Sequence, residues 1–157
     1  RSGLANANRV CIVGSGYGGY AALMGAVKTP DLYRCAVSLG GVTDLLELVS
    51  DSRWYLNQKP MMEMRVGSWW NDRERLRDTS PVAHASEIRT PLLLMHGLMD
   101  RFVPVSHGRA MAEALQSSGK TTFTYVELPV ADHVLHREED RQRVFSELEA
   151  FLTQHLN

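Results

Sequence analysis

The sequence lacks the features that mark several large classes of protein. Two cysteines among 157 residues are too few for a disulfide framework, and Cys11 and Cys35 both lie in apolar runs. We therefore expect them to be small core residues in a reducing, cytoplasmic compartment. No apolar run approaches the roughly 20 residues that cross a bilayer. A formal net charge of −1 lacks the excess of positive charge that attracts nucleic acid or an anionic membrane, so we expect neither as a partner.

The alternation of apolar runs and amphipathic stretches predicts an α/β fold. Short β-branched or apolar runs predict strands at 9–13, 35–39, 91–95 and 122–128. Helices are expected between them: one over 17–27, one capped by Ser106 and stopped at Gly119, and a closing one over 137–155. The "PLLLM" run is apolar throughout, as in parallel strands buried on both faces. We therefore predict a mostly parallel sheet of about four strands flanked by helices.

The segment 42–81 gives a mixed signal. Asp44 could cap a short helix, and "NDRERLRD" is typical of a solvated helical turn. We expect the aromatic and methionine residues of this segment to form a packed insertion, either as local core or as a wall of a substrate pocket. These residues are Trp54, Tyr55, Met61, Met62, Met64, Trp69 and Trp70.

The glycine-rich stretch "VCIVGSGYGGY" after the first predicted strand fits two kinds of site. Gly14, Gly16 and Gly19 match the G-x-G-x-x-G loop that binds a dinucleotide pyrophosphate. The same stretch matches the G-x-S-x-G turn of a serine hydrolase, except that Gly16 stands at the nucleophile's position. A dinucleotide site would need an acid about 20 residues further on. The second strand ends "SLGG" instead, which disfavours that reading.

Acid and histidine follow the later strands, in the order that a hydrolase triad requires. Asp100 follows the third predicted strand, and Asp132, His133 and His136 follow the fourth. Side chains at the carboxyl ends of parallel strands meet at one edge of the sheet. A carboxylate there can orient an imidazole to take a proton from a nucleophile. Taken singly, Asp100 could be a turn residue and His133 a loop residue.

Two further readings of the histidines carry less weight. His133-x-x-His136 could suggest a metal, but no third ligand follows at a suitable spacing, so we expect none. We interpret the remaining histidines as structural or solvated: His84, His96, His107 and His155.

Three stretches together resemble a known family. "RVCIVGSGYGGYAALM", "PLLLMHGLMDRFVPVSHG" and "ELPVADHVLHREEDRQRVFSELEAFLTQHL" are similar to the catalytic domain of the prolyl oligopeptidase family, which includes dipeptidyl and acylaminoacyl peptidases. The resemblance implies that residues 1–157 form a single unit, the C-terminal half of an α/β-hydrolase fold. It also implies a serine peptidase that cleaves short peptides and needs no cofactor.

The resemblance assigns roles to individual positions. Gly16 falls on the nucleophile of the family, Asp100 on its acid and His133 on its histidine. The backbone N–H of Tyr17 would supply one oxyanion-hole donor. The apolar S1 pocket of the family suggests four substrate-binding residues: Val103, Val42, Trp54 and Tyr55.

The chain departs from the family at Gly16. Glycine cannot attack a carbonyl, and losing a triad nucleophile removes on the order of 10⁶ in turnover. Ser15 does not replace it, because neighbouring side chains near a strand end point to opposite sides. We therefore expect an impaired peptidase. A serine-to-glycine substitution in a competent scaffold and a natural pseudoenzyme or peptide-binding module both account for this.

The second departure is length. Members of the family have further strands and a loop with an oxyanion contact before the glycine-rich turn, so we expect a unit truncated at its N-terminus. Four strands would leave the first as an open edge with unpaired N–H and C=O groups. We expect this edge to be covered by the protein's own N-terminal region or by another copy of the chain.

Overall fold

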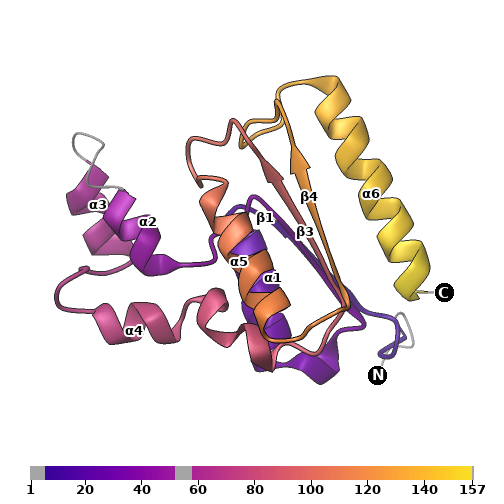
Figure 1. Ribbon diagram of the computed structural model, residues 1–157, viewed down its shortest axis with the longest axis horizontal. Coiled ribbons are helices and arrows are strands. Elements are labelled where there is room, and N and C mark those ends of the chain that lie inside the picture. The colour runs from indigo at the N-terminus through magenta and orange to yellow at the C-terminus, as the bar shows by residue number, and fades with distance from the viewer. Residues whose placement is uncertain (1–5, 52–57, 157) are drawn as a thin grey trace.

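A parallel β-sheet forms the centre of the molecule in the computed structural model, which describes residues 6–51 and 58–156 (Figure 1). Its four strands lie in the order β1-β2-β3-β4, and all three neighbouring pairs are parallel. The strands are β1 Cys11–Ser15, β2 Cys35–Leu39, β3 Leu92–Gly97 and β4 Phe123–Leu128. The predicted α/β class, with a four-stranded parallel sheet flanked by helices, is confirmed.

Helices occupy most of the chain between and after the strands. The α-helices are α1 Tyr17–Lys28, α2 Leu45–Asp51, α3 Gln58–Arg65, α4 Arg73–Asp78, α5 Ser106–Ser117 and α6 Glu138–Leu156. Two short 3₁₀ segments, η1 Pro30–Leu32 and η3 Pro81–Glu87, begin at prolines. This placement is expected because proline needs no acceptor for the N–H that it lacks at a helix start.

Two apolar layers enclose the sheet. Figure 1 shows α1 and α5 on one face and α6 on the other. Alternate residues of β3 serve the two layers: Leu94 packs in the cluster that includes Met111 of α5, while Leu93 packs in the cluster that includes Phe151 of α6. This alternation explains why the β3 sequence is apolar throughout, since both faces of the strand are buried.

The ends of the helices partly follow the predicted caps. The carboxylate of Asp44 accepts hydrogen bonds from the N–H groups of Leu46 and Glu47, at 2.8 and 3.1 Å, so it caps α2 as expected. The prediction that Ser106 caps α5 was wrong. Val105 already has helical dihedral angles, and the Ser106 hydroxyl instead donates to Glu47 at 2.5 Å.

The expected packed insertion of aromatic and methionine residues is only partly present. Met64 is 79% exposed and Trp70 73% exposed, so these two side chains lie on the surface and not in a local core. Trp54 and Tyr55 lie outside the described residues. The segment contributes to the site through other residues, Val66 among them, as described below.

A disulfide joins Cys11 of β1 to Cys35 of β2, contrary to the expectation of two free thiols. The two residues are direct neighbours in the parallel register, with their Cα atoms 4.6 Å apart, within the range that a disulfide spans. Sequence analysis could not find this pair because spacing along the chain carries no information about which strands are adjacent.

β1 is an edge strand in the described part of the structure, because it pairs with β2 alone. Val13, near its carboxyl end, is 49% exposed. Among the described helices, none is long and apolar enough to cross a membrane.

Candidate active site

The turn between β1 and α1 holds residue 16 in an unusual conformation. Gly16 has a φ of +56° and a ψ of −119°, a combination that side-chain-bearing residues adopt only under strain. Its N–H donates to the carbonyl of Leu39 and its carbonyl accepts from the N–H of Tyr20. A Cβ on nearby Gly19 would lie 2.7 Å from the Oγ of Ser38. The turn is therefore compact, and glycine at position 19 is required by close packing against β2.

Residue 16 faces His133. A Cβ built on Gly16 would lie 3.1 Å from the Nε2 of His133 and 3.4 Å from its Cε1. Any side chain at this position would therefore meet the imidazole directly. The structure thus brings together two positions that are far apart in the sequence, as the order of motifs predicted.

Asp100 and His133 form a hydrogen-bonded pair. The Nδ1 of His133 lies 2.7 Å from the Oδ2 of Asp100. The other carboxylate oxygen accepts from the N–H groups of Phe102 and Val103, each at 2.9 Å. Since the Asp100 side chain is only 2% exposed, these donors compensate for its burial.

The pair fixes the proton on the imidazole. A carboxylate accepts hydrogen bonds, so the Nδ1 of His133 must carry a proton, and the neutral ring then has a lone pair on Nε2. That Nε2 is the atom that faces residue 16. The His133 side chain is 23% exposed, so a bound molecule can reach it. An accessible imidazole nitrogen with a lone pair has the geometry that general-base chemistry needs.

Gly40 lies directly beside this pair. The sequence pattern did not indicate it as a site residue. Gly40 follows β2 with a φ of +54°, and a Cβ there would lie 3.2 Å from the Oδ2 of Asp100 and 3.6 Å from the Nδ1 of His133. The glycine pair after the second strand was the available signal. By itself, that pair indicates only the end of a strand.

The N–H of Tyr17 lies at the first position of α1, where no helical carbonyl can accept its hydrogen bond. The Tyr17 ring itself is 81% exposed and lies against the ring of Tyr20.

A mostly apolar cavity of about 380 Å³ adjoins Tyr17. Its wall includes Val42, one of the four residues expected at a substrate pocket, together with residues that the sequence pattern did not indicate. Val103 does not line it: this residue is 6% exposed and its N–H holds Asp100. The phenol of Tyr20 donates to the carbonyl of Thr79, and burial raises its pKa. The lining residues are Tyr17, Tyr20, Val42, Leu45, Leu48, Arg65, Val66, Arg75 and Thr79.

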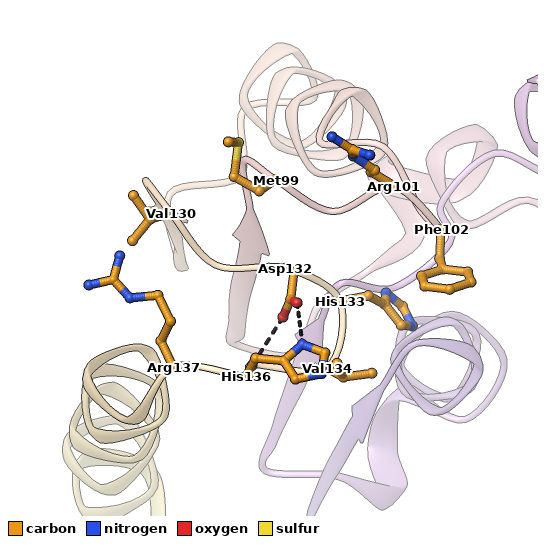
Figure 2. A pocket seen from close by; sticks show the side chains of 9 residues that line it. All are labelled: Met99, Arg101, Phe102, Val130, Asp132, His133, Val134, His136 and Arg137. Carbon is orange, nitrogen blue, oxygen red and sulfur yellow. Dashed lines mark hydrogen bonds and ion pairs between the residues drawn. The ribbon is translucent and has the colours of Figure 1, made fainter.

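A second cavity, of about 420 Å³, is lined in part by His133 (Figure 2). Here His136 hydrogen-bonds Asp132, and this bond lowers the pKa of the Asp132 carboxyl. The ring of Phe102 lies 5.5 Å from that of His133, centroid to centroid. Within 6–51 and 58–156, no group of three or more His, Cys, Asp or Glu residues could hold a metal ion.

Comparison with known proteins gives a consistent relationship. The profile of the prolyl oligopeptidase family matches residues 1–157. The chain is 30% identical over 157 residues to dipeptidyl aminopeptidase BIII of Pseudoxanthomonas mexicana, covering 98% of this chain and 23% of that protein. It is 28% identical to dipeptidyl peptidase family member 6 of Caenorhabditis elegans, covering 97% of this chain and 21% of the relative.

A solved structure of a puromycin-hydrolyzing peptidase from Mycobacterium tuberculosis superposes with a TM-score of 0.86 at 25% identity, covering 99% of this chain and 23% of that one. The chain thus spans less than a quarter of the length of these relatives. The match favours the hydrolase interpretation of the glycine-rich turn over the dinucleotide one. With the sequence profile and the fold in agreement over the whole chain, the protein belongs to the prolyl oligopeptidase family.

Proposed function

We propose that this chain carries the catalytic centre of a serine-type peptidase that hydrolyses short peptides, and that glycine at position 16 impairs it. The observation that supports this most directly is the 3.1 Å between a Cβ at position 16 and the Nε2 of His133. With serine at this position, its hydroxyl would adjoin a nitrogen that the Asp100 hydrogen bond leaves free to accept a proton.

The reaction then proceeds in two displacements. The serine Oγ bonds to the substrate carbonyl carbon as its proton passes to the Nε2 of His133. The N–H of Tyr17 donates to the oxyanion that forms. His133 returns the proton to the leaving amine nitrogen as the C–N bond breaks. Water repeats the sequence on the acyl-enzyme, so that a carboxylic acid is released and the serine is restored.

Glycine at position 16 removes the attacking atom and leaves the rest of the site in place. A loss on the order of 10⁶ in turnover is expected from such a change. The Asp100–His133 pair, the Tyr17 N–H and the apolar cavity could still bind a peptide. A non-catalytic, peptide-binding protein is therefore the second candidate function, and Gly16 itself is the observation that favours it.

Short peptides are the proposed substrates because the two relatives described above are named as a dipeptidyl aminopeptidase and a dipeptidyl peptidase family member. The cavity beside Tyr17 and Val42 offers an apolar wall for one substrate side chain. Trp54 and Tyr55, which lie outside the described residues, remain proposed contributors to the same pocket. Val103 is not part of this wall; its N–H supports Asp100 instead.

The decisive experiment restores the missing atom. Gly16→Ser in the full-length protein should be labelled by a fluorophosphonate probe, which bonds to the serine oxygen as fluoride leaves. Hydrolysis of dipeptidyl p-nitroanilides should appear with it. The Gly16→Ser, His133→Ala double variant is the matched control and should not be labelled. Folded Gly16→Ser protein that binds peptides without labelling would favour the peptide-binding alternative.

We further propose that the exposed edge of β1 is covered in the working protein, either by an N-terminal region or by a second copy of the chain. Unpaired N–H and C=O groups along an edge strand invite pairing. Sedimentation of the 157-residue chain should therefore show self-association. A stable monomer at micromolar concentration would contradict this proposal.

A further inference from the structure

The turn that carries Asp100 has no regular secondary structure of its own. It runs from Gly97, the last residue of β3, to Val103. Its beginning is anchored by the N–H groups of Leu98 and Met99, which donate to the carbonyls of Leu128 and Ala131 at 3.0 Å each. Its end is held differently, by the bond from the Val103 N–H to Asp100 and by one bond to the Val103 carbonyl.

That last bond comes from His96. The Nε2 of His96 lies 2.8 Å from the carbonyl oxygen of Val103 and 3.8 Å from the Oδ2 of Asp100. The side chain is only 2% exposed. His96 therefore contacts both the end of the turn and the carboxylate at its centre, without touching the position where substrate would react.

The fold makes room for this ring. Gly108 of α5 packs against it so closely that a Cβ there would lie 2.9 Å from the Nδ1 of His96. The Nε2 faces two acceptors, the Val103 carbonyl and the Asp100 carboxylate, so the proton of the neutral ring must reside on Nε2.

Burial lowers the pKa of His96, while nearby Asp100 and Glu127 raise it and His133 lowers it. The net result is a lowered pKa, which favours the neutral ring with its proton on Nε2.

We propose that His96 is a positioning residue for the acid of the site. Its Nε2–H donates to the Val103 carbonyl and so fixes the end of the turn. The Phe102 and Val103 amides then stay hydrogen-bonded to one oxygen of the Asp100 carboxylate. The other oxygen remains available to His133. This rests on the proposed function, because Asp100 has a catalytic role only there. The structural part of the proposal, that His96 fixes the turn, does not depend on it.

Three variants separate positioning from general stability. His96→Gln retains an N–H donor that can reach the Val103 carbonyl, whereas His96→Asn is polar but one methylene shorter. Leu94→Val is the matched control, because Leu94 is buried two residues earlier on β3 and lies away from the turn. Hydrogen exchange at the Phe102 and Val103 amides is measured in the Gly16 protein, and the fluorophosphonate labelling rate in the Gly16→Ser background.

We expect His96→Asn to accelerate exchange at both amides and to slow labelling by about 100-fold, as a displacement of about 1 Å in a catalytic group can do. His96→Gln should restore both properties, and Leu94→Val should change neither beyond its effect on global stability. Equal exchange and labelling in His96→Asn and the unmodified proteins would overturn the proposal.

Equal loss of amide protection and labelling in His96→Gln and His96→Asn, at matched thermal stability, would also overturn the proposal. If Gly16→Ser with His96 intact is never labelled, the proposed function fails, while amide exchange still decides whether His96 fixes the turn.

Discussion

His133 hydrogen-bonds Asp100 at 2.7 Å across 33 residues of sequence, and its other ring nitrogen faces residue 16. The three positions come from the ends of three different strands. His133 follows β4, and β2 and β3 lie between β4 and β1. Its imidazole must therefore extend across the ends of these strands to reach residue 16. The glycine after β2 at position 40 allows this, since it places no side chain under the ring.

Replacing the acid tests whether this pair controls the tautomer of His133. In the Gly16→Ser background, Asp100→Asn should lower the p-nitroanilide rate by about 10⁴, because an amide can hold the imidazole in the wrong tautomer. Folding should change little, since the asparagine oxygen can still accept from Phe102 and Val103. Rates within about tenfold of the Gly16→Ser protein would contradict a role for Asp100 in fixing the tautomer of His133.

A methyl group at position 40 should disturb the Asp100–His133 pair. Gly40→Ala places a Cβ 3.2 Å from the Asp100 carboxylate at a φ of +54°. We expect a loss of about 1–2 kcal/mol from the left-handed backbone alone, and a shifted His133 imidazole N–H resonance from the displaced carboxylate. NMR of histidine-labelled protein measures this shift.

Gly119→Ala is the control for the backbone effect. Gly119 has a φ of +78° with nothing within 4 Å of a Cβ. It should lose similar stability and leave the His133 resonance unchanged. If both variants, or neither, moved the resonance, Gly40 would have no special relationship to the pair.

The disulfide should contribute measurably to stability. It closes a loop of 24 residues, and the chain-entropy treatment assigns such a loop about 3 kcal/mol. Cys11→Ser, Cys35→Ser protein should therefore unfold at lower denaturant concentration than the oxidised protein. Thiol titration of the unfolded, unreduced protein should detect none; two reactive thiols there would show that the cysteines are free.

Stability should fall on mild acidification. Burial lowers the pKa of His96 and of His107 below the ordinary value of 6.5. Each is therefore protonated less readily in the folded than in the unfolded protein, so unfolding takes up protons once the pH drops below about 6.5. Their contribution is complete above that pH and decreases below it, by up to about 1.4 kcal/mol per pH unit for each group.

Urea unfolding between pH 7 and 5, a range set by the ordinary histidine pKa, measures this slope. His96→Gln should reduce it by removing one of the two groups. His84 acts in the opposite sense, because its hydrogen bond to Glu87 raises its pKa, but it lies near the surface and is screened. A slope unchanged in His96→Gln would show that folding does not lower the pKa of His96.

The positions of most elements could be predicted because burial leaves a local signature. Strands apolar on both faces, such as "PLLLM", and the closing helix with its apolar stripe were identified because a parallel sheet must be covered on both sides. The first strand is displaced by two residues, to Cys11–Ser15, because its limits depend on pairing with β2. Ser106 looked like a cap, yet its hydroxyl is used by Glu47 from a distant helix.

The sequence by itself determined the fold class, the order of glycine turn, acid and histidine, and the absence of a nucleophile at position 16. These are properties of residue type and spacing. Only the tertiary structure decided that Cys11 lies beside Cys35, that Gly40 lies under the Asp100–His133 pair and that His96 holds the acid's turn. These relationships depend on strand register and on which loops meet at the edge of the sheet. The local sequence pattern encodes neither of these two properties.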